Sequence, residues 1–427
     1  MHYSTMRPIF LWMKKIYARP LTKPLTPIRS ATVECSVGFS TCSMTPETRQ
    51  LAEGVLRGNR LALSRAITLI ESTKESHRLD AEALLDHVVY ERSRRVREKG
   101  RLKPGNSTSN AACVADEGRI GTSENVRPLR VGIAGPPGAG KSTFIEALGK
   151  YLTDSKKLRV AVIAVDPSSS RSGGSILGDK TRMYELAKDP KAFVRACPTS
   201  GVLGGVARYT NDVVLLCQAA SFDIVFIESV GLGQSETIID QASDMLLLLV
   251  PPAGGDELQG VKKGIMEVAD VIVVNKADGH LLTAAQHTAA AYQHALCFQR
   301  RKWDAWMPSV TLCSALERHR IADVWEQVCS CSDVFRRSGY LRLKRQNQDK
   351  YWVWNSLEDI LVRRARTSSK IKAGVERMEK ELGKGTLTPR SAAEILLADF
   401  FEEQKSPTKS MAPFQQSTSC FRPSSSD

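Results

Sequence analysis

Long apolar runs are missing from this chain of 427 residues. A membrane-spanning helix needs about 18 or more consecutive apolar residues, and no such run occurs, so no transmembrane helix is expected. Acidic residues are missing from the first 33 residues, and the first carboxylate belongs to Glu34. That stretch contains the basic residues Arg7, Lys14, Lys15, Arg19, Lys23 and Arg29. This composition is typical of a mitochondrial transit peptide, and a disordered basic tail is the alternative.

A pairing pattern is missing among the ten cysteines, which favours a reducing compartment such as the cytosol or the mitochondrial matrix. Cys329 and Cys331 form a C-x-C with no second Cys or His cluster nearby, so no metal site is expected there. His280, His287 and His294 recur every seven residues. On one helix the last two would lie about 10 Å apart, too far to share a metal, so surface positions are expected.

The net charge of +14 is not spread evenly along the chain. Residues 131–335 hold 20 Lys and Arg against 22 Asp and Glu, so the middle of the chain is close to neutral. The excess lies in the first 33 residues and near the C-terminus, for example at Arg336, Arg337, Arg342, Lys344, Arg345, Arg363, Arg364 and Arg366. We interpret the C-terminal excess as a solvated helix face, with an acidic protein partner as the alternative, and we expect no nucleic-acid partner.

The segment 135–142 fits the phosphate-binding P-loop pattern G-x-x-x-x-G-K-[ST]. A buried-strand run at 129–134 precedes it and a helical segment at 142–152 follows, which is the context that the motif needs. Backbone N–H groups and the helix N-terminus would face the phosphates, while Lys141 would reach the β- and γ-phosphates and Ser142 would bind Mg²⁺. The predicted contacts are Gly135, Pro136, Pro137, Gly138, Ala139, Gly140, Lys141, Ser142 and Thr143.

A second pair of motifs indicates which base is bound. The strand-like run 270–274 ends in Asn275-Lys276-Ala277-Asp278, which fits N-K-x-D. The Asp278 carboxylate can accept from guanine N1–H and from its exocyclic amine, a donor pair that adenine lacks, and the Lys276 stem would pack along the base. After the next strand, Ser314-Ala315-Leu316 fits a loop whose backbone N–H groups contact guanine O6. These residues, together with Asn275, predict GTP rather than ATP.

Two more predicted strands end in acids, at Asp166 and Glu228. Ligands of an open parallel sheet bind at the carboxyl ends of its strands, so these two carboxylates and Ser142 are predicted to bind Mg²⁺. The catalytic candidates are Lys141, Asp166, Asp179 and Glu228, and the three acids are the candidates for ordering the attacking water. Gln234 is three residues beyond Gly231 rather than adjacent to it, which suggests slow intrinsic turnover and activation by a partner.

Two Gly-rich segments, 171–182 and 251–260, each follow a strand and precede a helix. We interpret them as loops that respond to the γ-phosphate, with plain flexible connections as the alternative.

The alternation of strands and helices predicts an α/β fold with a doubly wound, mostly parallel sheet of the P-loop GTPase type, extended by helices at both ends. Ala81, Leu84, Leu85, Val88 and Val89 follow the spacing of one helix face. The predicted regions are a transit peptide (1–44), an N-terminal helical region (45–99), a linker (100–128), the GTPase domain (129–338), a C-terminal helical arm (339–402) and a disordered tail (403–427).

Several long runs resemble the MeaB/ArgK family of P-loop GTPases, which includes the methylmalonic aciduria type A proteins. The resemblance extends from about residue 45 to about residue 401 and rests on the segments 135–143, 166–169, 173–183, 231–236, 251–260 and 352–355. Small departures are Ser229 in place of the usual Thr, Gln218 in place of the usual Glu, and a longer polar segment at 99–128. None of them touches the nucleotide motifs.

This resemblance implies a Mg²⁺-dependent GTPase that binds GTP and GDP and acts as a chaperone of adenosylcobalamin-dependent methylmalonyl-CoA mutase. The implied role is to gate cofactor delivery and protect the mutase in the mitochondrial matrix. It also implies a homodimer formed through the C-terminal arm, with cobalamin adenosyltransferase as a further candidate partner. No D-x-H-x-x-G occurs, so adenosylcobalamin is expected only through the partner enzyme. The alternatives are a P-loop kinase or transport-coupled ATPase, and a nickel-insertion type GTPase.

Overall fold

The computed structural model describes residues 44–72, 74–101, 128–166, 183–198, 203–229, 235–252, 263–298 and 302–405. Residues 1–43, which hold the predicted transit peptide, lie outside the described residues, as do Asp179, Gly231 and Gln234. The described part of the chain contains no helix that is both long and apolar enough to cross a membrane.

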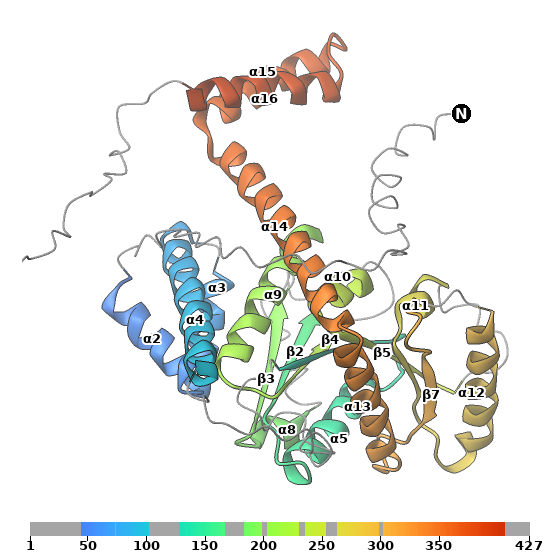
Figure 1. The fold of residues 1–427 in the computed structure, drawn as a ribbon. Helices are drawn as coiled ribbons and strands as arrows, with labels where there is room; N and C mark the ends of the chain where they lie inside the picture. Colours follow the sequence, from blue (N-terminus) through green and yellow to red (C-terminus); the bar gives the residue numbers. More distant parts are fainter. Residues whose placement is uncertain are drawn as a thin grey trace, which may run out of the picture. The chain divides into compact units, whose positions relative to one another are not determined.

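A seven-stranded sheet in the order β3-β2-β4-β1-β5-β6-β7 forms the centre of the fold (Figure 1). Its strands are β1 (Leu129–Ala134), β2 (Val160–Asp166), β3 (Ala192–Pro198), β4 (Ile224–Glu228), β5 (Met245–Val250), β6 (Val271–Val274) and β7 (Ser309–Leu312). All pairings between these strands are parallel, which confirms the predicted fold class. The inner strands are runs of Val, Ile and Leu because helices cover both faces of the sheet.

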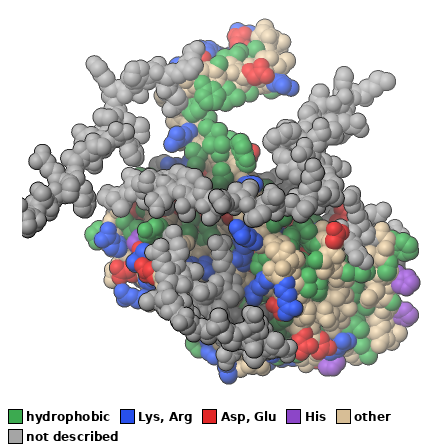
Figure 2. Space-filling view, viewed as in Figure 1, with side chains coloured by type: hydrophobic (Ala, Val, Ile, Leu, Met, Phe, Trp, Pro, Cys, Tyr) green, Lys and Arg blue, Asp and Glu red, His purple; other side chains and the backbone are tan. Residues whose placement is uncertain are grey.

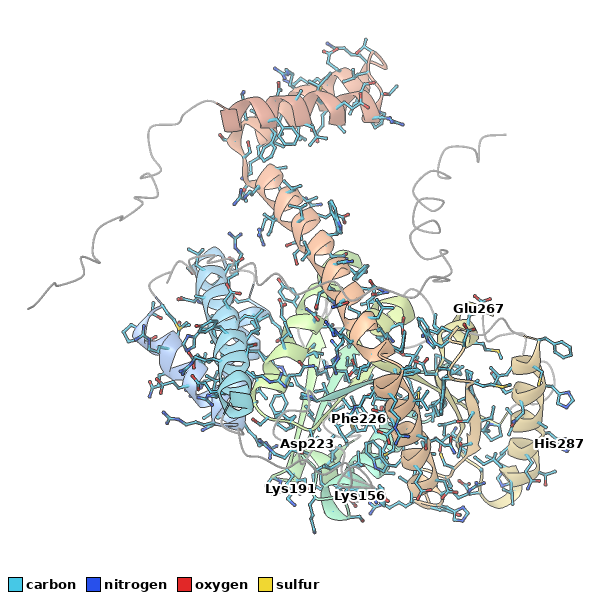
Figure 3. All side chains as sticks on the ribbon, viewed as in Figure 1. Lys156, Lys191, Asp223, Phe226, Glu267 and His287 are labelled. Carbon is cyan, nitrogen blue, oxygen red and sulfur yellow. The ribbon has the colours of Figure 1, made fainter. Side chains whose placement is uncertain are left out.

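Seven α-helices lie in the described part of the GTPase domain, and a short 3₁₀ helix, η2 (Gly279–Leu281), precedes α12. They are α5 (Lys141–Asp154), α8 (Tyr184–Lys188), α9 (Leu203–Ala219), α10 (Ser235–Ala242), α11 (Lys263–Val268), α12 (Leu282–Cys297) and α13 (Ile321–Arg337). Side chains of α5 and α13 pack with one face of the sheet, while α9, α10 and α12 pack with the other. Phe226 on β4 is fully buried in the first of these two cores (Figure 3).

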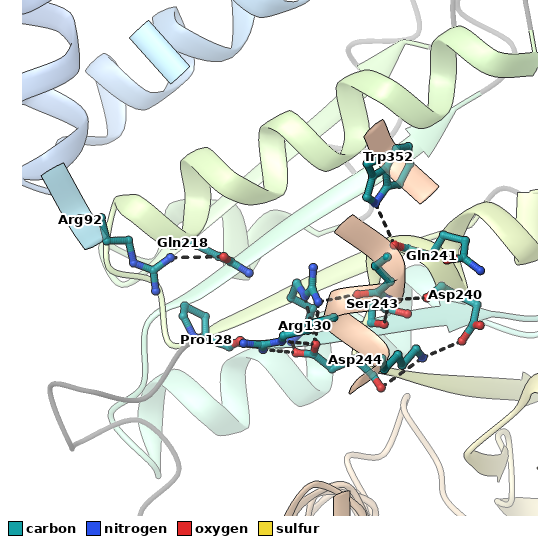
Figure 4. A network of polar contacts seen from close by, with 12 residues as sticks. Arg92, Pro128, Arg130, Gln218, Asp240, Gln241, Ser243, Asp244 and Trp352 are labelled. Atoms are coloured by element: carbon teal, nitrogen blue, oxygen red, sulfur yellow. Dashed lines mark hydrogen bonds and ion pairs between the residues drawn. The ribbon is translucent and has the colours of Figure 1, made fainter. Parts of the chain in front are cut away.

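The N-terminal helices α2 (Pro46–Leu56), α3 (Arg60–Ile70) and α4 (Glu75–Arg101) pack together and against α9. The apolar face predicted from sequence is confirmed, because Ala81, Leu84 and Val88 are buried. Gln218, one of the departures from the family pattern, accepts a hydrogen bond of 3.2 Å from Arg92 and so joins α9 to α4 (Figure 4). The neutral amide of Gln218 therefore still accepts from Arg92, although it lacks the charge of the usual Glu.

The C-terminal residues form α14 (Tyr340–Thr367), α15 (Ser369–Gly383) and α16 (Pro389–Lys405). The first half of α14 packs against α9, α10 and α13, and α15 packs against α16 as an antiparallel pair (Figure 1). Ser368 caps α15 by accepting from the Ile371 amide. This arrangement leaves the second half of α14 with many exposed side chains.

Candidate nucleotide-binding site

The P-loop joins the end of β1 to the start of α5 at the carboxyl edge of the sheet. Two of its glycines are required by geometry. A Cβ on Gly135 would lie 2.1 Å from the Leu249 carbonyl oxygen, which a side chain could not tolerate. Gly140 has a φ of +85°, a conformation that costs an L-residue about 1–2 kcal/mol. The loop therefore turns tightly and leaves α5 with a free N-terminus, as a phosphate site needs.

Lys141 and Ser142 begin α5 and belong to two different sets of contacts. The Lys141 ammonium donates to the carbonyl oxygens of Gly135 (2.9 Å) and Pro136 (3.2 Å), so it lies over the loop. The Ser142 hydroxyl donates to Glu228 Oε1 over 2.9 Å. Ser142, the motif residue predicted to bind the metal, is thus joined to the acid at the end of β4.

The strand register shows where the two predicted acids stand in the sheet. Glu228 pairs with Ile133 on β1 and with Ala164 on β2, and β2 ends two positions later at Asp166. Both acids therefore end strands at the carboxyl edge of the sheet, and Glu228 contacts the P-loop helix through Ser142. Glu228 is buried, and the Asp166 side chain lies outside the described residues. A hydroxyl together with a carboxylate is the oxygen donor set that Mg²⁺ prefers, so these residues fit that ion.

Asn275 holds the two halves of the site together. Its Nδ2 donates to the Ala139 carbonyl in the P-loop over 2.9 Å, and its Oδ1 accepts from the Ala315 amide over 3.0 Å. The side chain is 1% exposed. The loop expected to carry guanine is therefore tied to the loop expected to carry phosphate through one buried amide.

Asp278 and Ser314 are in direct contact through their side chains. The Ser314 hydroxyl donates a short hydrogen bond to Asp278 Oδ2 and accepts from the Glu317 amide over 3.1 Å. Leu316 is 80% exposed and Lys276 is exposed, so their side chains are accessible from solvent. Lys276 has a φ of +59°, which is an uncommon backbone conformation for a residue other than glycine.

Sequence reasoning located these residues but missed two contacts. It assigned Ser314 a backbone role only, whereas the hydroxyl orients the Asp278 carboxylate. It also treated Asn275 as a nucleotide contact, whereas its amide spans two loops. The Ser314–Asp278 contact could have been suspected from the sequence, because Ser314 is a hydroxyl residue in the predicted guanine loop. The Asn275 contacts could not, because they join residues far apart in the chain.

Other chemistry-bearing residues lie elsewhere. The described cysteines are all free, and burial raises the pKa of Cys217 and of Cys313 to about 12, which leaves these thiols protonated. The described residues contain no cluster of His, Cys, Asp or Glu suited to hold a metal. The three histidines of the seven-residue spacing are exposed, as predicted, and His287 points away from the sheet (Figure 3).

Comparisons with known proteins show the family to which this chain belongs. The family model for "Methylmalonyl Co-A mutase-associated GTPase MeaB" matches residues 119–370. The methylmalonic aciduria type A homolog of Mus musculus is 42% identical over 82% of this chain and 79% of its own length, and the homolog of Caenorhabditis elegans is 41% identical over 83% and 84%. Both are named mitochondrial.

Bacterial relatives are also similar. The GTPase ArgK of Escherichia coli is 38% identical over 83% of this chain and 97% of its own length. A crystal structure titled LAO/AO transport system kinase superposes with a TM-score of 0.57 at 32% identity, over 83% of this chain and 97% of that one. The family match covers more than half of the chain, and the relatives share the P-loop fold. This chain is a P-loop GTPase, and it belongs to the MeaB family of methylmalonyl-CoA mutase-associated GTPases.

Proposed function

We propose that this GTPase is a chaperone of adenosylcobalamin-dependent methylmalonyl-CoA mutase that gates cofactor delivery and protects the mutase in the mitochondrial matrix. The printed family description, a mutase-associated GTPase, and the mitochondrial names of the animal relatives support this. The structural observation that supports the GTP-dependent part is the Asn275 bridge, because its hydrogen bonds tie the loop predicted to bind guanine to the loop predicted to bind phosphate.

The proposed roles within the site follow from its contacts. Lys141 stabilises charge on the γ-phosphate, Asn275 and Ser314 position the guanine loop, and Asp278 selects the base. Ser142, Glu228 and Asp166 form the Mg²⁺ site. Bound Mg²⁺ neutralises charge on the β- and γ-phosphates. Asp166, Asp179 and Glu228 remain the candidates for ordering the attacking water.

The second half of α14 supports the proposed homodimer. Five large apolar side chains there are exposed, namely Val353, Trp354, Leu357, Leu361 and Val362. Hydrophobic side chains are visible on this part of the surface in Figure 2. Contiguous apolar patches on a helix favour a protein interface, and a second copy of the arm is the proposed occupant. Sedimentation of the full chain should give a dimer, and Trp354→Glu with Leu361→Glu should give a monomer that still binds GDP.

The chaperone proposal is tested by titrating purified methylmalonyl-CoA mutase into this protein while GTP hydrolysis and GDP affinity are measured. The mutase should raise turnover and change GDP affinity, because a partner that distinguishes nucleotide states must alter nucleotide binding by the same factor. The matched control is the Asp278→Asn variant. Its hydrolysis and nucleotide affinity should change on addition of the mutase when a xanthine nucleotide replaces the guanine nucleotide. No change in either quantity at saturating mutase would reject the chaperone role and leave a GTPase without this partner.

The proposed location has its own test. A fluorescent fusion of residues 1–45 should enter mitochondria, because that segment is basic and nearly free of acids. The matched control replaces Arg7, Arg19 and Arg29 with Gln and should stay in the cytosol. Cytosolic fluorescence of the unaltered fusion would contradict the proposed location.

A further inference from the structure

Four side chains on the first half of α14 contact the end of α10 and the start of β5. We name Lys344, Arg345, Gln348 and Trp352 the α14 clamp (Figure 4). Gln348 Nε2 donates to the carbonyl oxygens of Asp240 (2.8 Å) and Ser243 (2.7 Å). The Trp352 indole N–H donates to the Gln241 carbonyl over 3.0 Å. The clamp thus supplies donors to carbonyls at the end of α10 that the helix itself leaves unsatisfied.

The centre of the clamp is a buried carboxylate between two arginines. Asp244 is fully buried and accepts from Arg130 of β1 and from Arg345 of α14, over 2.8 Å and 2.6 Å at the shortest. Burial would raise the pKa of Asp244, but the two guanidinium groups outweigh burial and hold it well below its usual range. Gln348 Oε1 also accepts from Arg130 over 2.7 Å. The strand that leads into the P-loop is therefore tied to α14.

A second carboxylate joins α10 and α11 to the same helix. Asp240 Oδ1 accepts from Lys344 over 2.8 Å and lies 3.4 Å from the ammonium of Lys302. Lys302 also donates to the Val268 carbonyl, the last residue of α11, over 2.8 Å. The ends of α10 and α11 are therefore connected through Asp240 and Lys302, and Lys344 of α14 is the second lysine that contacts Asp240.

α10 and α11 run from the nucleotide side of the sheet toward α14. α10 is the first described element after Glu228 and Ser229, and α11 is the first described element after Pro251 and Pro252. Both helices begin on the nucleotide side of the sheet. The end of α10 contacts the α14 clamp directly, and the end of α11 contacts Lys302, which shares Asp240 with the clamp. A movement of either helix along its axis would displace carbonyl acceptors from fixed donors. A buried charge that loses its partner raises the free energy of the folded protein. The helices should therefore occupy a few discrete positions rather than move gradually past the clamp.

We propose that the α14 clamp couples the nucleotide site to the C-terminal arm, so that GTP and GDP favour different arrangements of α14 in this protein alone. The proposal rests on the GTPase activity and does not depend on the mutase. Coupling is reciprocal, so a partner that binds one arrangement of the arm more tightly than the other must in turn alter the preference between GTP and GDP. The opposite interpretation, a permanent anchor for α14, predicts the same contacts in every nucleotide state.

Hydrogen exchange of the full chain, without mutase, separates the two interpretations. Amides of residues 340–352 are compared with GDP and with a non-hydrolysable GTP analogue, each at saturation. In the parent protein we expect exchange rates in this segment to differ by about fivefold or more, the lower end of typical coupling factors. Identical rates in both states would overturn the proposal.

Variants of the clamp show whether the difference in exchange rate between the two nucleotide states depends on its contacts. Lys344→Met removes the ammonium at Asp240 and should reduce the difference to less than about twofold, while a difference between the nucleotides persists near the P-loop. Lys350→Met, at an exposed lysine of the same helix, should retain the parental difference. Trp352→Phe removes the indole N–H together with part of the ring, and it is the second variant if Lys344→Met does not fold. A parental difference in both Lys344→Met and Trp352→Phe would reject the clamp as the coupling element.

Discussion

Replacing Asn275 with alanine would break the connection between the phosphate loop and the guanine loop. The change removes the donor to the Ala139 carbonyl and the acceptor for the Ala315 amide, at 2.9 Å and 3.0 Å in the parent. Both bonds are buried, so neither backbone group can turn to bulk water without rearrangement.

The size of the effect follows from those two orphaned groups. A buried donor or acceptor left without a partner costs about 1–3 kcal/mol, so the pair should lower the free energy of unfolding by about 2–6 kcal/mol. GDP affinity should fall as well, because the guanine loop is no longer held against the P-loop. Asn275→Asp keeps an acceptor for Ala315 but sets a carboxylate against the Ala139 carbonyl, so it should be no better tolerated.

The assay is urea denaturation of the nucleotide-free protein, combined with calorimetric titration of GDP. The matched control is Asn347→Ala, at an exposed asparagine of α14, which should change the free energy of unfolding by less than about 0.5 kcal/mol. If Asn275→Ala is as stable as this control and binds GDP as the parent does, the bridge does not organise the site.

Three further outcomes are expected. Asp278→Asn should lose the preference for GTP and gain xanthine nucleotide in competition binding, and equal parental affinity for ATP and GTP would contradict guanine selection. Lys141→Ala should slow phosphate release by about 100-fold or more, the typical cost of losing one stabilising charge, and parental turnover would refute its role. Asp189 has a pKa lowered to about 2, because Lys150, the Lys191 amide and Thr153 outweigh its burial. Its contribution to stability is therefore full above the unfolded pKa of about 3.9 and is lost as the pH falls toward 2, so Asp189→Asn should flatten acid denaturation curves in that window.

The sequence by itself determined the elements whose signal is local. The run 129–134, the P-loop and the helix after it are one continuous segment, and the structure has β1 and α5 there. The parallel sheet also followed from local patterns, because strands buried on both faces must be apolar throughout. β3 gave no comparable signal, since it contains Arg195 and lies at the edge of the sheet.

Tertiary structure alone decided which distant residues meet. Asn275 joins residues on either side of it, 136 positions before and 40 after, and no local pattern encodes that contact. Arg345 and Asp244, 101 positions apart, would each look like a solvated surface charge when viewed in sequence. α14 folds back over the end of α10, which buries Asp244 fully and Arg345 in part, and the Asp244 carboxylate accepts from both Arg345 and Arg130. The nucleotide motifs are local in sequence, but the contacts that hold them together and link them to the arm exist only once the chain has folded.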